Sequence, residues 1–287
     1  MTVTSTSDQD LQRAVLLDQR YGAQPKPGNI IWNEVIETQL RHKSVRTFCP
    51  EPLPEGALET MVAAAQSAST SSALHQWSVI AVTDPDLKQR ISDIIAATVP
   101  TDRIPWIEEA PALLLWVADA SRSAAITRAQ GSEPVILEQL DAFLMAAVDA
   151  SLAAQNAALA AESIGLGVVF LGVLRNAARE VAEIVGLPPH AFFTFGMAVG
   201  RPDPDRVSAP RPRLSQSVML HINRYDEAAH GPALEGYEAA YSQFRETQGM
   251  GPKTWQDAVH ESATSMAYLG GRERLREMVS ERGFKLR

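Results

Sequence analysis

The stretch AAQNAALAAESIGLGVVFLGVLRN, from Ala153 to Asn176, decides the fold. Its first half ends a helical pattern that begins near residue 134, and the pattern stops at Gly165. The β-branched residues that follow, between Gly167 and Gly172, predict a short buried strand. Before the alanines, the helical pattern carries large apolar residues on one broad stripe: Leu137, Leu140, Leu144, Met145, Val148 and Leu152.

The second half of this helix, residues 153–161, is rich in alanine. Small side chains let another backbone approach closely, which suits a helix at the centre of the molecule or across a dimer axis. The alternative is that alanine is there only because it favours helix.

Working outward, short apolar segments predict further strands at residues 78–83, 112–118, 192–199 and 218–223. Helical patterns cover residues 11–21 and 54–68. From residue 225 on the chain is polar and helical in pattern, interrupted by Gly249, Gly251 and Pro252, as expected of an arm that wraps over another part. We expect an N-terminal extension at residues 1–31 and one domain at 32–287, with the arm at about 226–287.

Charge and composition exclude several classes of protein. The 287 residues include 26 Lys and Arg against 34 Asp and Glu, a net charge of −8, which argues against broad attachment to nucleic acid or an anionic membrane. One cysteine, Cys49, excludes an intramolecular disulfide and a cysteine-based metal site. No secretory signal begins the sequence, and the longest apolar run, residues 110–118, is too short for a membrane helix, so we expect a cytoplasmic protein.

A short basic run, RHKSVR at residues 41–46, stands out in this acidic chain. It follows the helical pattern of residues 32–40, and its cations and the hydroxyl of Ser44 can converge on one anion. The alternative is a solvated basic face.

A second basic pair, Arg211 and Arg213, alternates with Pro210 and Pro212. Proline excludes helix here, and in an extended segment both guanidinium groups project to the same side. The alternative is a proline-stiffened surface loop.

The remaining candidates are a hydroxyl-rich turn and a glycine-rich passage. In the passage, Gly165, Gly167 and Gly172 have no Cβ, so a backbone N–H can come close to a planar ligand. Ser71 and Ser72 belong to a run of hydroxyl residues that can line a ligand, although serines also simply cap helices and form turns.

Dinucleotide, P-loop, zinc-protease and nucleophile-elbow motifs are absent from the sequence. An anion clamp without an obvious acid, base, nucleophile or metal site points to chemistry carried by an organic cofactor.

These segments together resemble the nitroreductase family, in particular its NADPH-dependent, oxygen-insensitive nitroreductases and flavin reductases. The resemblance runs from about residue 32 to 225 and rests on segments in the same order: RHKSVRTF, AAAQSASTSSALHQWSVIAV, AAQNAALAAESIGLGVVFLGVLRN, FGMAVGRP and APRPRLSQSVMLHINRY.

The resemblance implies an α+β fold, in which helices flank a mainly antiparallel sheet, and an intertwined homodimer with two FMN sites at its interface. It implies that the two basic segments hold the FMN phosphate and ribityl chain, that the Ser-rich turn contributes nearby, and that the backbone of the GLGVVFLGV passage contacts the flavin ring. The residues concerned are His42, Lys43, Ser44, Arg46, Ser71, Ser72, Phe170, Leu171, Gly172, Val173, Arg211 and Arg213.

Three positions depart from the family pattern. Arg103 aligns where a glutamine near the flavin is usual, and would favour anionic reduced flavin or an acidic or nitro group on the substrate. Phe170 stands where an aromatic hydroxyl is common and Val173 where a second glycine is common, so we expect a more apolar and tighter pocket.

The implied activity is that of an enzyme that uses NADPH (or NADH) and FMN to reduce a nitroaromatic, a quinone or a flavin by a ping-pong, two-electron mechanism. No side chain is assigned as a catalytic acid or base, because hydride passes through FMN N5. Two alternatives remain: another flavin reaction on the same fold, such as dehalogenation or dehydrogenation, and a non-catalytic flavin-binding protein.

Overall fold

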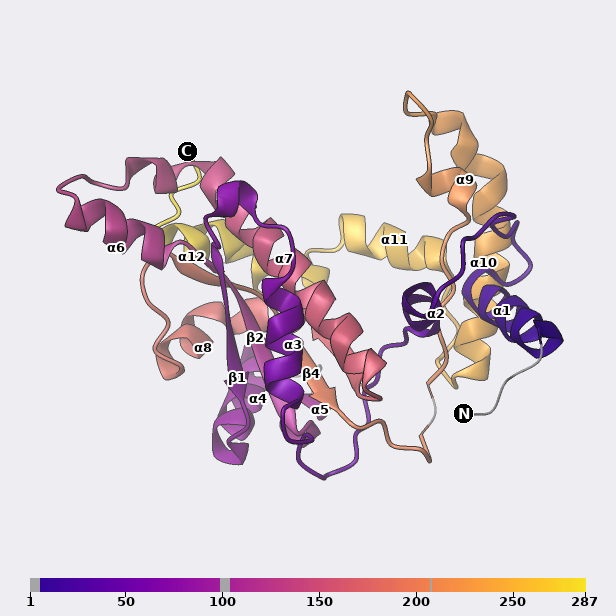
Figure 1. Ribbon diagram of the computed structural model, residues 1–287. Helices are drawn as coiled ribbons and strands as arrows, with labels where there is room; N and C mark the ends of the chain where they lie inside the picture. Colours follow the sequence, from indigo (N-terminus) through magenta and orange to yellow (C-terminus); the bar gives the residue numbers. More distant parts are fainter. Residues whose placement is uncertain (1–5, 99–103, 207) are drawn as a thin grey trace. The chain divides into compact units, whose positions relative to one another are not determined.

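The computed structural model describes residues 6–98, 104–206 and 208–287. The chain divides into two compact units, which we name by their content (Figure 1). The helical unit combines Met1–Lys43 with Val207–Tyr268, and the sheet unit combines Ser44–Arg206 with Leu269–Arg287. Each unit therefore joins segments that lie far apart in the sequence.

The sheet unit is built on a four-stranded sheet with the order β1-β2-β4-β3. Every neighbouring pair in it is antiparallel. The strands are β1 (Trp77–Val82), β2 (Ala112–Asp119), β3 (Gly167–Leu171) and β4 (Ala191–Gly200). They confirm the strands predicted at residues 78–83, 112–118, 167–172 and 192–199, and with the flanking helices they confirm the α+β class.

Helices cover both faces of this sheet (Figure 1). On one face α3 (Ala57–Gln66) and α7 (Leu140–Ser163) enclose a core that includes Met61, Trp116 and Met197. The opposite face is covered by α4 (Pro85–Thr98), α5 (Trp106–Glu109) and α8 (Ala178–Ile184), which pack on Leu113, Val117 and Phe193 among others. Because β2 lies in the middle of the sheet, between two helical layers, every one of its residues is buried.

The alanine face of α7 packs into the molecule, whereas four members of the predicted large apolar stripe face outward. Leu137, the first member of that stripe, lies before α7 in the 3₁₀ turn Val135–Glu138 and is buried. Ala146, Ala150, Ala153, Ala157 and Ala161 are fully buried, because their short side chains let α7 lie close to α3 and the sheet. Large side chains on the outer face of α7 are 43–51% exposed: Leu140, Leu144, Val148 and Leu152.

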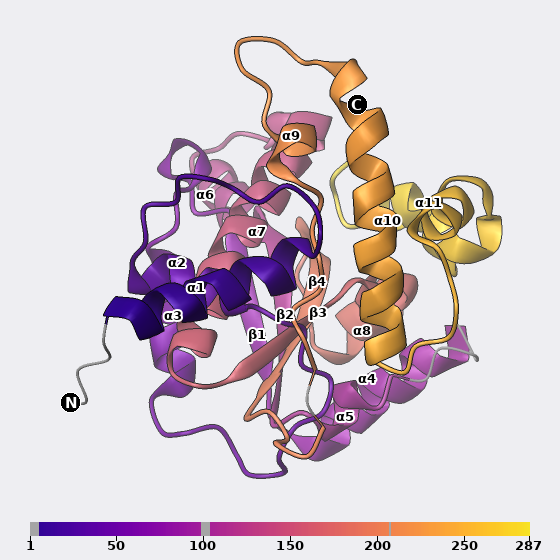
Figure 2. The same ribbon diagram turned by 90° about the vertical axis from the view of Figure 1, so that its right-hand side faces the viewer.

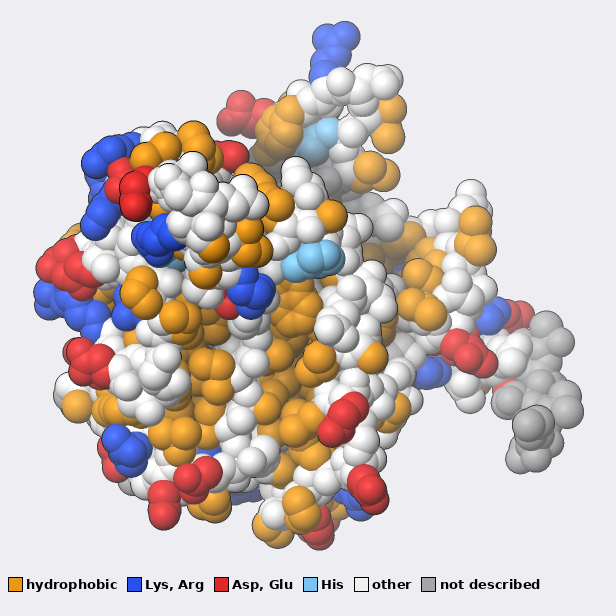
Figure 3. All heavy atoms as spheres, turned by 60° about the vertical axis from the view of Figure 1, so that its left-hand side comes forward, with side chains coloured by type: hydrophobic (Ala, Val, Ile, Leu, Met, Phe, Trp, Pro, Cys, Tyr) orange, Lys and Arg blue, Asp and Glu red, His pale blue; other side chains and the backbone are white. Residues whose placement is uncertain are grey.

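Hydrophobic side chains also gather on one face of the sheet unit in the space-filling view (Figure 3). The helix Leu140–Ser163 meets the length and composition of a membrane span. Its alanine face is buried against α3 and the sheet, and its large apolar side chains Leu140, Leu144, Val148 and Leu152 face outward.

A third apolar cluster closes the sheet unit. It joins α6 (Ser121–Ala129) and α12 (Leu275–Glu281) to Phe192 and Phe284. The chain passes from α12 into this cluster through Gly283, whose φ of +107° favours glycine, and a Cβ there would lie 3.0 Å from the His190 ring.

The helical unit contains α1 (Thr6–Tyr21), α2 (Glu34–Arg41), α9 (Gln216–Met219), α10 (His230–Thr247) and α11 (Trp255–Thr264). The side chain of Asn33 accepts a hydrogen bond from Ile36 N and so begins α2. Thr254 and Asp257 form a capping box that begins α11. The break between α10 and α11 falls where Gly249, Gly251 and Pro252 predict it.

The strand predicted at residues 218–223 is wrong. The segment begins with the helical turn α9, in which Val218 is buried, whereas Met219, Leu220 and Ile222 are 62–70% exposed. The segment is apolar, as the prediction assumed, but a strand also needs a hydrogen-bonded neighbour. Among the described residues, β pairing is confined to the four strands of the sheet and two isolated bridges, Ser44 with Val168 and Phe48 with Pro202. None of these pairs involves residues 218–223.

Candidate functional site

The first basic segment leaves the end of α2. His42 is the C-cap, and its φ of −48° and ψ of 131° turn the chain out of the helix, which frees the last carbonyls of α2. The guanidinium of Arg20 binds two of these carbonyls: its Nη2 donates to Leu40 O at 2.7 Å and to His42 O at 2.8 Å. The backbone that carries His42 and Lys43 is therefore held by a side chain from α1.

The second basic segment is bound by the same side chain. Arg20 Nη1 donates to Arg211 O at 2.9 Å, and Arg213 N donates to Arg20 O at 2.8 Å. The guanidinium of Arg211 lies over the Phe244 ring, 5.5 Å from its centroid, whereas Arg213 Nη1 turns back to Arg211 O at 3.1 Å. In the helical unit, the backbones of His42 and Arg211 therefore both bind the guanidinium of Arg20. Arg20 and Arg211 are 191 residues apart in the sequence.

Ser44 and Arg46 belong to the sheet unit. Ser44 forms a parallel bridge with Val168, and Val45 N donates to Val168 O at 2.9 Å, so this segment lies alongside β3 at the edge of the sheet. Val45 is buried, which places its two neighbours on the opposite side of the extended chain. Gly167 permits this approach, because a Cβ there would lie 2.5 Å from Val45 Cγ2.

Phe170 offers an aromatic surface in a strand that is otherwise buried. It is 37% exposed, and its ring meets Phe195 edge-on with the centroids 5.3 Å apart. Leu171 is buried in the core and Val173 packs against it, so these positions present mainly backbone to a ligand. Gly172 lies close to Arg175: a Cβ added to Gly172 would be 3.3 Å from Nη2 of Arg175.

The turn that contains Ser71 and Ser72 is tightly specified. Ser72, Ala73 and His75 have positive φ values of 50°, 55° and 51°. Asp149 on α7, which is 1% exposed, accepts hydrogen bonds from Ser71 N at 2.8 Å, Thr70 Oγ1 at 2.8 Å and Gln76 N at 3.3 Å. This carboxylate stabilises a backbone conformation that side chains rarely adopt.

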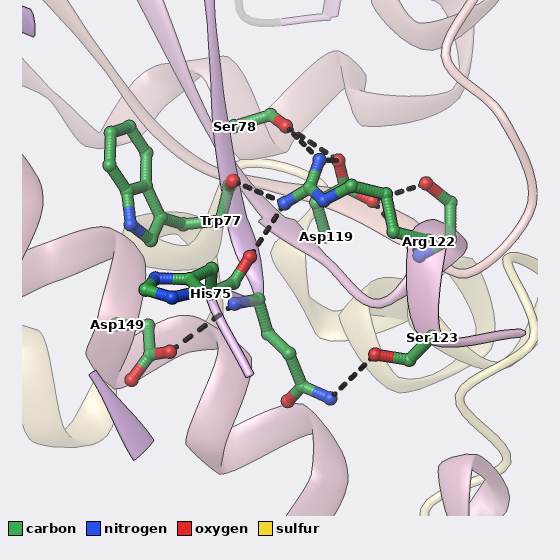
Figure 4. A network of polar contacts seen from close by, with 9 residues as sticks. His75, Trp77, Ser78, Asp119, Arg122, Ser123 and Asp149 are labelled. Carbon is green, nitrogen blue, oxygen red and sulfur yellow. Dashed lines mark hydrogen bonds and ion pairs between the residues drawn. The ribbon is translucent and has the colours of Figure 1, made fainter. Parts of the chain in front are cut away.

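The end of the turn, where β1 begins, is held by Arg122, which a second carboxylate, Asp119, holds in place (Figure 4). Arg122 Nη2 donates to the carbonyls of His75 and Trp77 at 2.6 and 2.7 Å, and its Nη1 donates to Asp119 Oδ2 at 2.9 Å. Burial opposes ionisation of Asp119, but hydrogen bonds from Ser121 and Ser78 and the nearby Arg122 outweigh it and lower its carboxyl pKa. Asp119 is therefore a stable anchor for Arg122 at neutral pH.

The turn and the aromatic surface lie at opposite edges of one chain's sheet. Ser71 and Ser72 precede β1, whereas Phe170 is on β3, and β2 and β4 lie between these strands. Trp77 is level with Phe192 of β4, and Phe170 is level with Met197. With about 4.8 Å between strands and 3.3 Å per residue, Trp77, which directly follows the turn, and Phe170 are roughly 20 Å apart.

Sequence reasoning missed four side chains that organise these segments: Arg20, Gln24, Asp149 and Arg122. The isolated carboxylate of Asp149 in the apolar stretch of α7 is a signal that could have been used. Arg20 and Gln24 carry no such signal, because the end of α1 and the segment after it contain other polar and charged residues. Arg103, predicted near the ring, lies outside the described residues.

Two further observations bear on ligands. Among the residues that the structure describes, no group of three or more His, Cys, Asp and Glu side chains is placed to hold a metal ion. A hollow of about 430 Å³ in the helical unit is lined by residues of α10 and the segment before α11: Ser242, Arg245, Glu246, Met250, Pro252, Lys253 and Thr254.

Comparison with known sequences agrees with the resemblance seen in the motifs. The nitroreductase family matches residues 40–201, and the C-terminal domain of that family matches residues 211–287. The FMN reductase (NADPH) of Bacillus subtilis is 33% identical over 259 residues, which cover 88% of this chain and 98% of the relative. An NADPH-dependent oxidoreductase of Staphylococcus epidermidis is 34% identical over 86% of this chain and 95% of its own length.

Solved structures show the same relationship. A nitroreductase from B. subtilis has a TM-score of 0.79 and 32% identity and covers 88% of this chain and 100% of its own. An NADPH:FMN oxidoreductase from Vibrio harveyi, solved with NAD⁺, has a TM-score of 0.74 and 30% identity and covers 89% and 100% of the two chains.

Proposed function

Because the chain belongs to the nitroreductase family, we propose that it uses NAD(P)H to reduce a nitroaromatic, a quinone or free flavin by two electrons, with FMN as its prosthetic group. The chain is an FMN-dependent NAD(P)H oxidoreductase, as its relatives support. The acceptor class and the ping-pong order, in which donor and acceptor use one site in turn, are the finer parts of the proposal.

The residues present fit FMN. Phe170 with Phe195 offers an exposed aromatic surface suited to a planar ring. The helical unit of this acidic protein holds a cationic group suited to a phosphate, with the backbones of its two segments already tied together by Arg20. When bound, FMN supplies the hydride acceptor and two-electron donor that no side chain provides.

The phosphate is assigned to the basic segments. The residues that would bind it and the ribityl chain are His42, Lys43, Ser44, Arg46, Arg211 and Arg213. Charge-assisted hydrogen bonds from guanidinium and ammonium groups are the strongest that a phosphate can accept from a protein. The observation that carries the proposal is the tie through Arg20, because a solvated basic face would need no buried cation holding two such segments together.

The ring is assigned to the chain around Phe170. The backbone from Phe170 to Val173 would donate hydrogen bonds to it and orient it for hydride transfer, since Leu171 has its side chain in the core. The apolar Phe170 and Val173 limit water at this position. Solvent donates the proton to the reduced product, so the chain needs no side-chain acid.

The proposal includes a homodimer in the cytoplasm. In one chain Trp77, at the end of the Ser71–Ser72 turn, lies roughly 20 Å from Phe170 by strand spacing, so we place the turn too far from Phe170 for both to contact one flavin ring. A second copy can supply the turn, and the outward stripe of Leu140, Leu144, Val148 and Leu152 gives it an apolar surface to bury.

The preference for NADPH over NADH is also part of the proposal. The additional 2′-phosphate of NADPH needs local cations, because the protein as a whole is acidic. Arg245 and Lys253 line the hollow of the helical unit and are candidates for that contact. Reduction of the bound flavin by NADPH, compared with reduction by NADH, tests this preference.

The decisive experiment is an anaerobic spectral titration of the purified protein. We expect yellow protein with bound FMN, loss of the oxidised flavin band on adding NADPH more readily than NADH, and its return on adding a nitroarene or quinone. A protein that stays colourless in excess FMN would overturn the cofactor assignment. A reduced protein that reacts only with halogenated phenols, or with no acceptor, would instead indicate dehalogenation or a non-catalytic flavin protein.

A further inference from the structure

We propose that Arg20 and Gln24 are positioning residues that set the geometry of the phosphate-binding segments before the cofactor binds. They lie at and just beyond the end of α1, in the leading part of the chain for which the sequence indicates no function. The inference rests on the proposed FMN function and adds a role for a segment outside the family match, which begins at residue 40.

Arg20 acts as a three-way tie between backbones. Its side chain is buried, with the residue 6% exposed, and its two terminal nitrogens donate to carbonyls of both basic segments and of the helix end before the first one: His42, Arg211 and Leu40. A planar guanidinium presents its donors in a rigid fork, so the three carbonyls are held at one spacing. Carbonyl dipoles at the end of α2 also favour a cation at this place.

Gln24 extends the tie along the second segment. Its Nε2 donates to Arg213 O at 2.9 Å and to Tyr21 O at 2.8 Å, and its Oε1 accepts from Ser215 N at 3.2 Å. Gln24 is 3% exposed, so both ends of a buried amide are satisfied. With the bond from Arg213 N to Arg20 O, alternate residues of the segment from Arg211 to Ser215 are fixed by the end of α1.

The turn between Arg20 and Gln24 is itself constrained. Gly22 ends α1 with a φ of +59°, and its N donates to Asp18 O at 2.8 Å. A Cβ at Gly22 would lie 2.9 Å from the Cβ of Ala240, since the end of α1 reaches α10 at this point (Figure 2). On the other side, Tyr237 of α10 donates to Pro212 O at 3.4 Å. Residues 20–24, which we call the bracket because they bind the backbones of both basic segments, therefore pack against α10.

Such a bracket suits a phosphate site for an electrostatic reason. Lys43, Arg211 and Arg213 carry like charges and repel one another when no anion lies between them. Hydrogen bonds from Arg20 and Gln24 to the backbone hold the segments together without using those side chains. The basic side chains therefore meet the phosphate on an already ordered backbone, which lowers the entropy lost on binding.

The test compares FMN with riboflavin, which has the same ring but no phosphate. Full-length protein is freed of flavin, and the Kd of each ligand is measured for wild type, Arg20→Lys and Gln24→Leu. Lysine keeps the charge but cannot bind three carbonyls through a fork, and leucine removes both ends of the amide. Arg13→Lys is the matched control, because Arg13 lies on α1 and pairs with Glu37 rather than with a carbonyl of either segment.

We expect wild type to bind FMN much more tightly than riboflavin. In both bracket variants the ratio of the two Kd values should fall at least tenfold, with riboflavin binding changed less than twofold, and in Arg13→Lys the ratio should stay within twofold of wild type. General destabilisation would instead weaken both ligands alike, and thermal unfolding identifies a variant that does not fold.

Two failures are distinguishable. If wild type does not prefer FMN to riboflavin, the phosphate clamp of the proposed function is wrong and the positioning role falls with it. If wild type prefers FMN and either folded variant keeps the full preference, the clamp stands and the positioning role is overturned.

Discussion

At the scale of single residues, buried polar side chains stabilise the chain through hydrogen bonds that other side chains at the same positions could not all make. Asp149 is the sharpest case. One oxygen accepts from Ser71 N, and the other accepts from Thr70 Oγ1 and Gln76 N. Two of these three donors are backbone N–H groups, which cannot reverse their role. The turn with three positive φ residues therefore requires a carboxylate at position 149.

We predict that Asp149→Asn destabilises the protein and weakens FMN binding. In either orientation the new NH₂ group faces a backbone N–H, from Ser71 or from Gln76, and one buried donor loses its acceptor at a cost of about 1–3 kcal/mol. Thermal unfolding and a flavin titration measure the two effects. Asp141→Asn, an exposed change on the same helix, is the control, and equal behaviour of the two variants would show that the turn does not depend on Asp149.

At the scale of elements, the start of β4 is joined to the end of α12 through His190. Its N donates to Arg282 O at 2.6 Å, and its carbonyl accepts from Ala120 N at 2.8 Å. The residue has a φ of 60°, and its ring lies against Phe284. Burial lowers the His190 pKa, Arg128 and Lys285 lower it further, and Glu138 raises it. The junction is therefore built around a neutral imidazole.

We predict that this junction makes the protein less stable in mild acid. The unfolded chain takes up a proton near the ordinary histidine pKa of about 6.5, whereas the folded chain does so only at lower pH, so stability falls as pH drops below about 6.5. His190→Asn tolerates the positive φ and removes the titration. The fall in unfolding temperature from pH 7 to pH 5 should be smaller in His190→Asn than in wild type, and unchanged in His260→Asn, an exposed histidine of α11. Equal slopes in all three proteins would exclude His190 as the cause.

At the scale of the whole molecule, the strand order separates site residues that a flavin must meet together. The turn before β1 and the aromatic surface on β3 are at opposite edges of one sheet. If two copies exchange these features, each site of the dimer combines the basic segments and Phe170 of one copy with the turn of the other. Two defects placed on different copies then fall in the same site.

We predict complementation between Arg213→Ala, which damages the clamp, and Asp149→Asn, which damages the turn. A heterodimer purified through two different tags has one doubly damaged site and one intact site, so its activity should be about half that of wild type. FMN is held at a concentration at which each variant homodimer is largely inactive, and the two homodimers are the controls. A heterodimer no more active than they are would place each site within one chain.

The sequence by itself determined the fold class, the four paired strands, the long helix and the two basic segments. These features depend on local patterns: alternation, helical spacing, glycine and proline at chain reversals, and runs of like charge. The same local reasoning failed at residues 218–223, because a short apolar segment cannot by itself supply a neighbouring strand.

Only the tertiary structure decided which residues hold these segments in place. It showed that the alanine face of α7 is buried and the leucine stripe is exposed, that Asp149 supports the turn, and that Arg20 joins His42 to Arg211. Each of these relations links positions far apart in the chain through a side chain's reach. Local spacing cannot encode such a link, because folding determines which distant carbonyl or sheet face a side chain will meet.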